Sequence, residues 1–248
     1  MSFDFSAVER KHAVVTGGSR GIGLAIARAL ASHGARVSIV SRRPGELEGF
    51  TTAQCDVGNE TDVGNAFNAC RKKNGPIAIL VNNSGISDSA PVVRTTKEMW
   101  DKIIATNLTG TFLCTRTALP DMIAAKWGRV LNVASIAGLS GAPYISAYTA
   151  SKHGMIGLTR AVAAEFQGKD ITANALCPGY TETDMMQQAI RSIVKHTNGT
   201  EDAARQALAH MNPEGRIATA EEVAIAALDL ICGGRTGISL VIPGGMEK

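Results

Sequence analysis

A glycine-rich stretch near the start of the chain has the sequence Thr16-Gly17-Gly18-Ser19-Arg20-Gly21-Ile22-Gly23. It joins a short β-branched run at residues 12–16 to a helical pattern over 21–33. In such a strand–turn–helix unit, Gly17 permits the tight turn, Gly21 lets the backbone approach a phosphate, and Gly23 lets the helix pack closely. The amino end of the helix offers free N–H groups and partial positive charge. The stretch predicts a dinucleotide-binding turn, although a glycine-rich turn without a ligand would have the same local pattern.

The rest of the chain repeats this alternation of short strand-like runs and longer helical patterns. It predicts a parallel sheet of about seven strands covered by helices on both faces, a doubly wound α/β fold. We find no repeat, low-complexity tract or flexible linker, so we expect one domain over residues 1–248. The further expected strands are 36–40, 51–55, 77–81, 129–133, 171–176 and 238–241, and the further expected helices are 60–73, 97–125, 147–167 and 220–231.

Two segments depart from this alternation. Residues 41–50 are too few for a regular crossover helix and contain Pro44 and Gly45, so we expect a loop or a single turn. Residues 180–219 carry apolar residues at partly helical spacing. They are either a lid over a site or surface helices, and we favour a lid at about 184–212.

The composition excludes several classes of protein. Of the 248 residues, 45% are hydrophobic and 19% are charged, which is typical of a folded domain. The net charge of +3 comes from scattered residues and gives no footprint for nucleic acid. The five cysteines are widely spaced, so we expect neither a disulfide framework nor a metal site. We see no signal peptide and no apolar run of bilayer length, and we expect a cytoplasmic protein without a membrane partner.

The end of the second expected strand bears on the choice of nucleotide. It has the sequence Ser41-Arg42-Arg43, and no acid follows until Glu46. An acid at this place binds the ribose 2′-hydroxyl of NAD. Arg42 and Arg20 can instead pair with a 2′-phosphate through charge-assisted hydrogen bonds. We therefore favour NADP(H), while NAD(H) bound through Ser41 stays open as the alternative.

A tyrosine and a lysine lie four positions apart, at Tyr148 and Lys152. On a helix these side chains share a face, and an ammonium group beside a phenol lowers the pKa of the phenol. Such a tyrosine can exchange a proton with an alcohol or a carbonyl. The pair alone is weak evidence, but Ser135 also follows a strand. Because the carboxyl ends of parallel strands meet at one edge of a sheet, we expect these residues to lie near the glycine turn.

Taken together, these motifs resemble the short-chain dehydrogenase/reductase family, whose fold is a single Rossmann-like domain. The resemblance extends from residue 10 to about residue 243 and is greatest to the 3-oxoacyl-thioester reductases. The order and spacing of the motifs make it specific. The matching residues are Thr16, Gly17, Gly21, Ile22, Gly23, Cys55, Asp56, Val57, Asn82, Asn83, Ser84, Gly85, Asn107, Ser135, Tyr148, Lys152, Pro178 and Gly179.

The resemblance implies four catalytic residues. Tyr148 would be the general acid in reduction and the base in oxidation. Ser135 would hydrogen-bond the substrate oxygen. Lys152 would lower the pKa of Tyr148 and hold the nicotinamide ribose, and Asn107 would anchor a water that links Lys152 to solvent.

The resemblance also implies the cofactor contacts. Asp56 and Val57 would touch the adenine, and Asn83 and Gly85 would border the adenosine ribose. The nicotinamide carboxamide would lie against the segment after the sixth strand. The full set of expected cofactor contacts is Gly17, Ser19, Arg20, Gly21, Ile22, Gly23, Ser41, Arg42, Asp56, Val57, Asn83, Gly85, Tyr148, Lys152, Pro178, Gly179, Thr181 and Thr183.

Three positions differ from the family pattern. Ser84 replaces an alanine, the 41–50 connection lacks the customary helix, and Pro243 stands where an aspartate often ends the last strand. The last departure touches a region where relatives pack subunits together. The resemblance nevertheless implies a homo-oligomer, a homotetramer or a dimer.

The resemblance implies an NADPH-dependent ketoreductase that transfers hydride to a ketone, with a CoA- or acyl-carrier-protein-linked 3-oxoacyl thioester as the favoured small-molecule substrate. Two alternatives stay open. One is an NAD-dependent secondary-alcohol or 3-hydroxyacyl-CoA dehydrogenase of a degradative pathway. The other is a nucleotide-sensing scaffold that kept the fold and lost the chemistry, against which the presence of all four catalytic residues argues.

Overall fold

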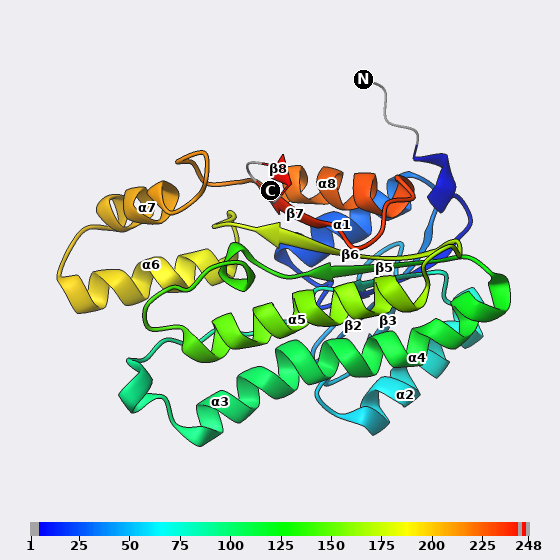
Figure 1. Ribbon diagram of the computed structural model, residues 1–248, viewed down its shortest axis with the longest axis horizontal. Helices are drawn as coiled ribbons and strands as arrows, with labels where there is room; N and C mark the ends of the chain where they lie inside the picture. The colour runs from blue at the N-terminus through cyan, green and yellow to red at the C-terminus, as the bar shows by residue number, and fades with distance from the viewer. Residues whose placement is uncertain (1–4, 243–244, 247–248) are drawn as a thin grey trace.

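The computed structural model describes residues 5–242 and 245–246 as one eight-stranded sheet between two layers of helices (Figure 1). The strand order is β3-β2-β1-β4-β5-β6-β7-β8, in which the first seven strands are parallel and β8 runs antiparallel to β7. The doubly wound α/β prediction is confirmed. The strands are β1 (His12–Thr16), β2 (Arg36–Ser41), β3 (Thr51–Gln54), β4 (Ile79–Asn82), β5 (Gly128–Val133), β6 (Ile171–Pro178), β7 (Ser239–Ile242) and β8 (Gly245–Met246).

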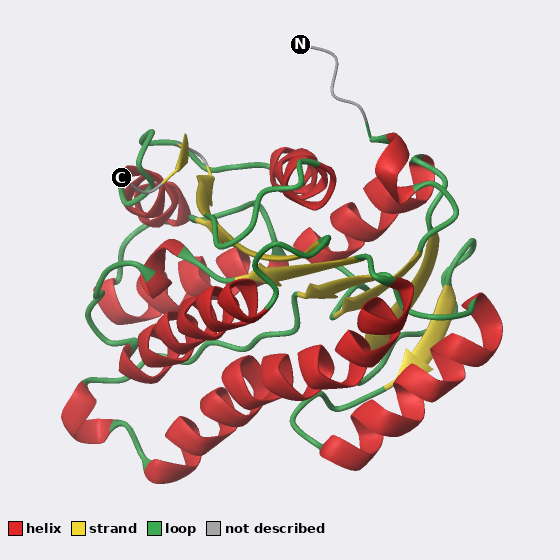
Figure 2. Ribbon diagram, turned by 45° about the vertical axis from the view of Figure 1, so that its right-hand side comes forward, coloured by secondary structure: helices red, strands yellow, loops and turns green. Residues whose placement is uncertain are grey.

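The central strands are buried on both faces because helices cover both sides of the sheet (Figure 2). Every residue of β1, β4, β5 and β6 is buried. One apolar core joins the sheet to α1 (Gly21–Ser32) and α8 (Ala220–Cys232). The other joins it to α2 (Glu60–Asn74), α4 (Gly110–Ala125) and α5 (Ser146–Glu165). The near-continuous apolar runs of these strands follow from this two-sided burial.

The helix expected over residues 97–125 is interrupted. It consists of α3 (Lys97–Ile104), a π-helical turn η3 (Ala105–Thr109) and α4, which continue one another in the chain. A π-helical turn inserts an extra residue into the helical repeat and often marks a functional site. Here the turn carries Asn107, one of the predicted catalytic residues.

The two irregular segments are placed as the sequence pattern indicated. Between β2 and β3 there is no helix, which confirms the predicted loop. The segment after β6 forms α6 (Asp184–Thr197) and α7 (Glu201–His210), which pack together through a small apolar cluster of their own. Both lie beyond the carboxyl ends of the strands, at the left of Figure 1. Their role as a lid stays a prediction.

The strand order reverses between β1 and β4. In doubly wound sheets, ligands bind in the crevice outside the carboxyl ends of the strands at such a point. This places the candidate site between the segments that follow β1, β2, β4 and β5.

Within residues 5–242, none of the helices combines the length and the hydrophobicity required to cross a membrane. The departure at Pro243 lies outside the described residues.

Candidate active site

The glycine turn after β1 has the backbone that its sequence predicts. Gly17 and Gly21 have φ angles of +63° and +53°, in the left-handed region that favours glycine. A Cβ added to Gly23 would lie 2.3 Å from Nδ2 of Asn83 and 2.6 Å from the carbonyl oxygen of Gly17. Helix α1 therefore begins in direct contact with the turn, and its first N–H groups can face a phosphate. Ser19 and Ile22 lie half-buried along the same turn.

The loop after β4 is fastened to this turn. The Thr16 hydroxyl accepts hydrogen bonds from the backbone N–H groups of Asn83 (2.9 Å) and Ser84 (3.0 Å). The Asn83 side chain donates to the carbonyl oxygens of Thr16 and Gly17 at 3.0 and 3.1 Å. Asn83 thus holds the two loops together, whereas its expected contact with the adenosine ribose stays a prediction. The Ser84 that replaces the family's alanine does not disturb this arrangement.

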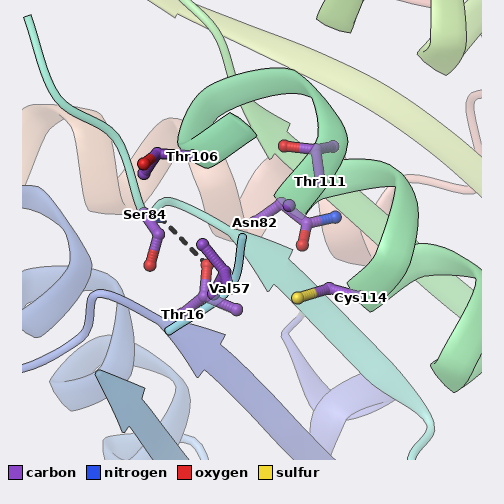
Figure 3. Close-up of a pocket in the computed structure, with 8 residues that line it drawn as sticks. Thr16, Val57, Asn82, Ser84, Thr106, Thr111 and Cys114 are labelled. Carbon is purple, nitrogen blue, oxygen red and sulfur yellow. Dashed lines mark hydrogen bonds between the residues drawn. The ribbon is translucent and has the colours of Figure 1, made fainter. Parts of the chain in front are cut away.

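A small polar pocket lies behind these loops (Figure 3). Its wall includes Oδ1 of Asn82, a buried oxygen without a hydrogen-bond partner among the described residues. The amide nitrogen of Asn82 donates to Thr115 (3.0 Å) and to Asn132 on β5 (2.8 Å). Sequence reasoning assigned no role to this residue. The residues that line the pocket are Thr16, Val57, Asn82, Ser84, Thr106, Gly110, Thr111 and Cys114.

Three of the four predicted catalytic residues meet at the carboxyl end of β5. Tyr148 lies on the first turn of α5, and the ammonium nitrogen of Lys152 is 5.6 Å from the centroid of its ring. Ser135, two residues beyond β5, lies near enough to Tyr148 to lower the pKa of its phenol. The Lys152 ammonium donates to the carbonyl oxygen of Val133 at 2.7 Å. The structure therefore brings together the phenol, the hydroxyl and the amine on one side of the sheet edge.

Burial shifts the pKa values of Tyr148 and Lys152. It raises the pKa of Tyr148 to about 12, against the opposing effect of the Ser135 hydrogen bond. It lowers the pKa of Lys152 to about 8. The net shift of the Tyr148 pKa is upward because removal of the phenol from water outweighs the effect of Ser135. The expected lowering of the Tyr148 pKa by Lys152 stays a prediction. At neutral pH the phenol keeps its proton.

Asn107 lies behind the catalytic residues and is fully buried. Its side-chain oxygen accepts from the backbone N–H of Ile86 at 2.9 Å. Its amide donates to the carbonyl oxygen of Ile86 at 2.9 Å and to the Ser151 hydroxyl at 3.0 Å. A Cβ on Gly85 would lie 3.5 Å from Oδ1 of Asn107 and 3.7 Å from the Lys152 amine. Asn107 thus joins the loop after β4 to α5, while its predicted role in holding a water is untested.

The residues expected near the adenosine are spread over the segments after β2 and β3. The Ser41 hydroxyl is buried and has no hydrogen-bond partner among the described residues. Arg42 is exposed beside it. Asp56 accepts a hydrogen bond from the Gly58 N–H at 3.0 Å, and Val57 is buried. An unsatisfied buried hydroxyl next to an exposed guanidinium can hydrogen-bond a ribose hydroxyl or a phosphate at this point.

Arg20, which was expected to contact a 2′-phosphate, instead forms an ion pair with the lid segment. Its guanidinium pairs with the Asp184 carboxylate at 3.1 Å, at the start of α6. The methyl carbon of Thr183 would lie 3.4 Å from a Cβ on Gly21. The start of the predicted lid therefore rests on the glycine turn, and Asp184 holds the arginine that was expected to reach a 2′-phosphate.

The segment after β6 is held by a residue that sequence reasoning missed. Asn212 is buried, accepts from the Tyr180 N–H at 2.6 Å and donates to the Tyr180 carbonyl oxygen at 2.8 Å. A Cβ on Gly179 would lie 2.2 Å from its Oδ1. This ties the end of the lid segment to the predicted nicotinamide contacts, Pro178, Gly179, Thr181 and Thr183. Asn212 is a lone asparagine in an irregular segment, and no pattern in the sequence marks it.

Comparisons with known proteins agree with this geometry. The family described as short chain dehydrogenase matches residues 11–193. A 3-oxoacyl-[acyl-carrier-protein] reductase of Bos taurus is 39% identical and aligns over 96% of this chain and 98% of its own. A D-beta-hydroxybutyrate dehydrogenase of Cupriavidus necator is 36% identical, over 89% of this chain and 90% of its own. Among solved structures, an actinorhodin polyketide ketoreductase variant with NADPH is 32% identical, with a TM-score of 0.88 over 98% of each chain.

Proposed function

The chain belongs to the short-chain dehydrogenase family, and on that premise we propose that it is an NADPH-dependent ketoreductase acting on 3-oxoacyl thioesters. As a member of this family it is an oxidoreductase of the alcohol–carbonyl pair. One observation carries the proposal: Tyr148, Ser135 and Lys152 lie together at the carboxyl end of β5, beside the strand-order reversal that the glycine turn borders.

A nicotinamide dinucleotide held at the glycine turn would supply the hydride for reduction of the carbonyl carbon. The protein supplies the proton and holds the oxygen. Tyr148 transfers its phenolic proton to the carbonyl oxygen, and the Ser135 hydroxyl donates a hydrogen bond to the same oxygen. The Lys152 ammonium stabilises the phenolate left on Tyr148 until solvent protons restore it. The product is the secondary alcohol.

The protonation of Tyr148 suits the role of general acid in reduction. A general acid must carry its proton when the substrate binds, and the pKa of Tyr148 near 12 ensures this at neutral pH. The polyketide ketoreductase and the 3-oxoacyl reductase among the relatives support the same direction.

Two observations support NADPH over NADH. No acid follows β2 until Glu46, and Arg42 stands next to the end of the strand, where an acid usually binds the ribose hydroxyls of NAD. The buried Ser41 hydroxyl beside it can hydrogen-bond a phosphate oxygen or a ribose hydroxyl, so it fits either dinucleotide. The structural relative named with NADPH supports the same choice. The glycine turn fits the pyrophosphate of either dinucleotide.

An NAD-dependent hydroxyacid dehydrogenase is the second candidate, because the Cupriavidus necator relative is named for that activity. Absorbance at 340 nm separates the two candidates. We expect faster consumption of NADPH than of NADH with 3-oxoacyl thioesters on CoA or acyl-carrier protein. Preferential reduction of NAD⁺ by a free 3-hydroxyacid would contradict the proposal.

We further propose that the protein is a homo-oligomer, either a tetramer or a dimer. Light scattering would measure its mass in solution.

The scaffold alternative is tested by Tyr148→Phe. Loss of the phenolic proton should lower kcat about 100-fold or more, while NADPH binding by fluorescence titration stays unchanged. A variant that binds NADPH and keeps full turnover would contradict the role of Tyr148. Wild-type protein that binds NADPH without reducing any thioester would favour the scaffold.

A further inference from the structure

A hollow of about 190 Å³ lies between the segment after β2, the loop after β4 and helix α3. Its apolar lining comes from Ile86, Met99 and Ile103. Its cations are Arg42 and Lys102, which come from different segments of the chain. Sequence reasoning gave no role to Lys102.

Neither cation is neutralised within the part of the chain that the structure describes. No ion pair or side-chain hydrogen bond there involves Arg42 or Lys102. The acid of the hollow, Asp88, accepts a hydrogen bond from the Ser89 N–H at 2.9 Å and pairs with neither cation. By contrast, Lys97 on the same helix is paired with Asp101 at 2.7 Å. Two unpaired cations on one hollow favour a ligand with concentrated negative charge.

The residues that line the hollow are connected to the proposed catalytic residues by hydrogen bonds and by a continuous helix. Asn107 binds both backbone groups of Ile86, which lines the hollow. Helix α3, which carries Lys102, leads directly into the π-helical turn that holds Asn107. The walls of the hollow are therefore fixed relative to Lys152 and Tyr148. Arg42 lies just after β2, on the adenosine side of the strand-order reversal.

We propose that Lys102 is a specificity-determining residue, the second cation of a ribose-phosphate site that it shares with Arg42. This inference rests on the proposed use of NADPH and names a residue that would discriminate it from NADH. Arg42 presents a planar fork of N–H groups, and Lys102 adds a point charge on a flexible stem from helix α3. The apolar residues that line the same hollow suit the edge of a purine.

A phosphate on the adenosine ribose occurs in two ligands. NADPH carries it at the 2′ position, and CoA carries it at the 3′ position. The experiment therefore compares three probes that lack the reactive ends, 2′,5′-ADP, 3′,5′-ADP and 5′-AMP. Calorimetry gives the Kd of each for wild-type protein and for Lys102→Gln, Lys102→Glu and Arg42→Gln. Lys97→Gln is the matched control, since Lys97 lies on the same helix outside the hollow. Thermal unfolding confirms that each variant is folded.

We expect wild-type protein to bind 2′,5′-ADP more tightly than 5′-AMP. Lys102→Gln should weaken 2′,5′-ADP binding about five- to tenfold, with a larger loss in Lys102→Glu, in keeping with a partly exposed charge-assisted contact. Binding of 5′-AMP should not change, and Lys97→Gln should match the wild type. A preference for 3′,5′-ADP lost in Lys102→Gln would assign the site to CoA and overturn the NADPH assignment.

Failure of the inference is distinct from failure of the proposed function. If wild-type protein prefers 2′,5′-ADP and Arg42→Gln removes the preference while both Lys102 variants keep it, only the role of Lys102 is overturned. Equal weakening of 2′,5′-ADP and 5′-AMP by Lys102→Gln would also overturn it. If wild-type protein shows no preference for either bisphosphate, NADPH specificity and the role of Lys102 both fail.

Discussion

The side-chain amide of Asn107 donates a hydrogen bond to the Ser151 hydroxyl at 3.0 Å, and this hydroxyl in turn donates to the Tyr148 carbonyl oxygen at 2.7 Å. The bond joins the π-helical turn to the first turns of α5. Ser151 directly precedes Lys152 in that helix. The position of both proposed catalytic groups on α5 thus depends on a residue from another helix.

Replacement of Ser151 by alanine should therefore lower activity without removing a group that touches substrate. We expect a loss of about 1 kcal/mol of stability, because the buried Asn107 amide loses a partner. We expect kcat to fall severalfold with little change in KM, since the proton donor is misplaced rather than removed. Ser32→Ala, at an exposed hydroxyl near the end of α1, is the control. Unchanged kcat in Ser151→Ala would show that Asn107 does not position α5 through this bond.

The buried amine of Lys152 should make stability depend on pH in a defined window. The pKa is 10.5 for an ordinary lysine and about 8 in the folded protein, so the folded state binds fewer protons between these values. Stability therefore rises with pH across the window, by up to about 1.4 kcal/mol per pH unit. Urea unfolding of wild-type protein and of Lys152→Met from pH 7.5 to 10 isolates this effect. The wild type should gain stability relative to the variant as the pH rises, and a constant difference would contradict the lowered pKa.

Much of the site could be anticipated from the chain because parallel strands bring their carboxyl ends to one edge. That rule places the turn after β1, Asn83 after β4 and Ser135 after β5 together, and helical spacing places Tyr148 beside Lys152. The loop over residues 41–50 followed from its length. These features depend on local pattern and on general topology.

Other features depend on contacts that no local pattern contains. The π-helical turn at Asn107 interrupts one long helical pattern over residues 97–125, and nothing in that pattern marks the interruption. The pKa of Tyr148 is raised because tertiary packing removes the phenol from water, which four-residue spacing to a lysine does not reveal. The bonds from Asn212 to Tyr180 join positions 32 residues apart. Lys102 and Arg42 come to line one hollow only when the chain is folded, because they lie 60 positions apart in different segments.

The ion pair between Arg20 and Asp184 predicts a competition at the glycine turn. Asp184→Asn removes a negative charge and frees the guanidinium, so NADPH should bind about two- to fivefold more tightly, as expected for one exposed ion pair. Fluorescence titration measures the change, and it should shrink at high salt. Glu182→Gln, which breaks an exposed pair with Arg205 in the same segment, is the control. Weaker binding in Asp184→Asn would indicate that the pair instead keeps α6 in a closed position needed for NADPH.

The close approach of helix α1 to the glycine turn predicts opposite effects of alanine at two helical glycines. At Gly23, the new Cβ would meet Asn83 at 2.3 Å and the Gly17 carbonyl oxygen at 2.6 Å, so the turn and the loop after β4 must separate. We expect a loss of about 2 to 3 kcal/mol of stability, typical of overpacking, together with weaker NADPH binding. At Gly64 in α2 nothing lies within 4 Å, and alanine should stabilise the protein by up to about 1 kcal/mol through helix propensity. Urea unfolding measures both values. If Gly23→Ala were as stable as Gly64→Ala and bound NADPH normally, the contact between turn, helix and Asn83 would not be what shapes the phosphate site.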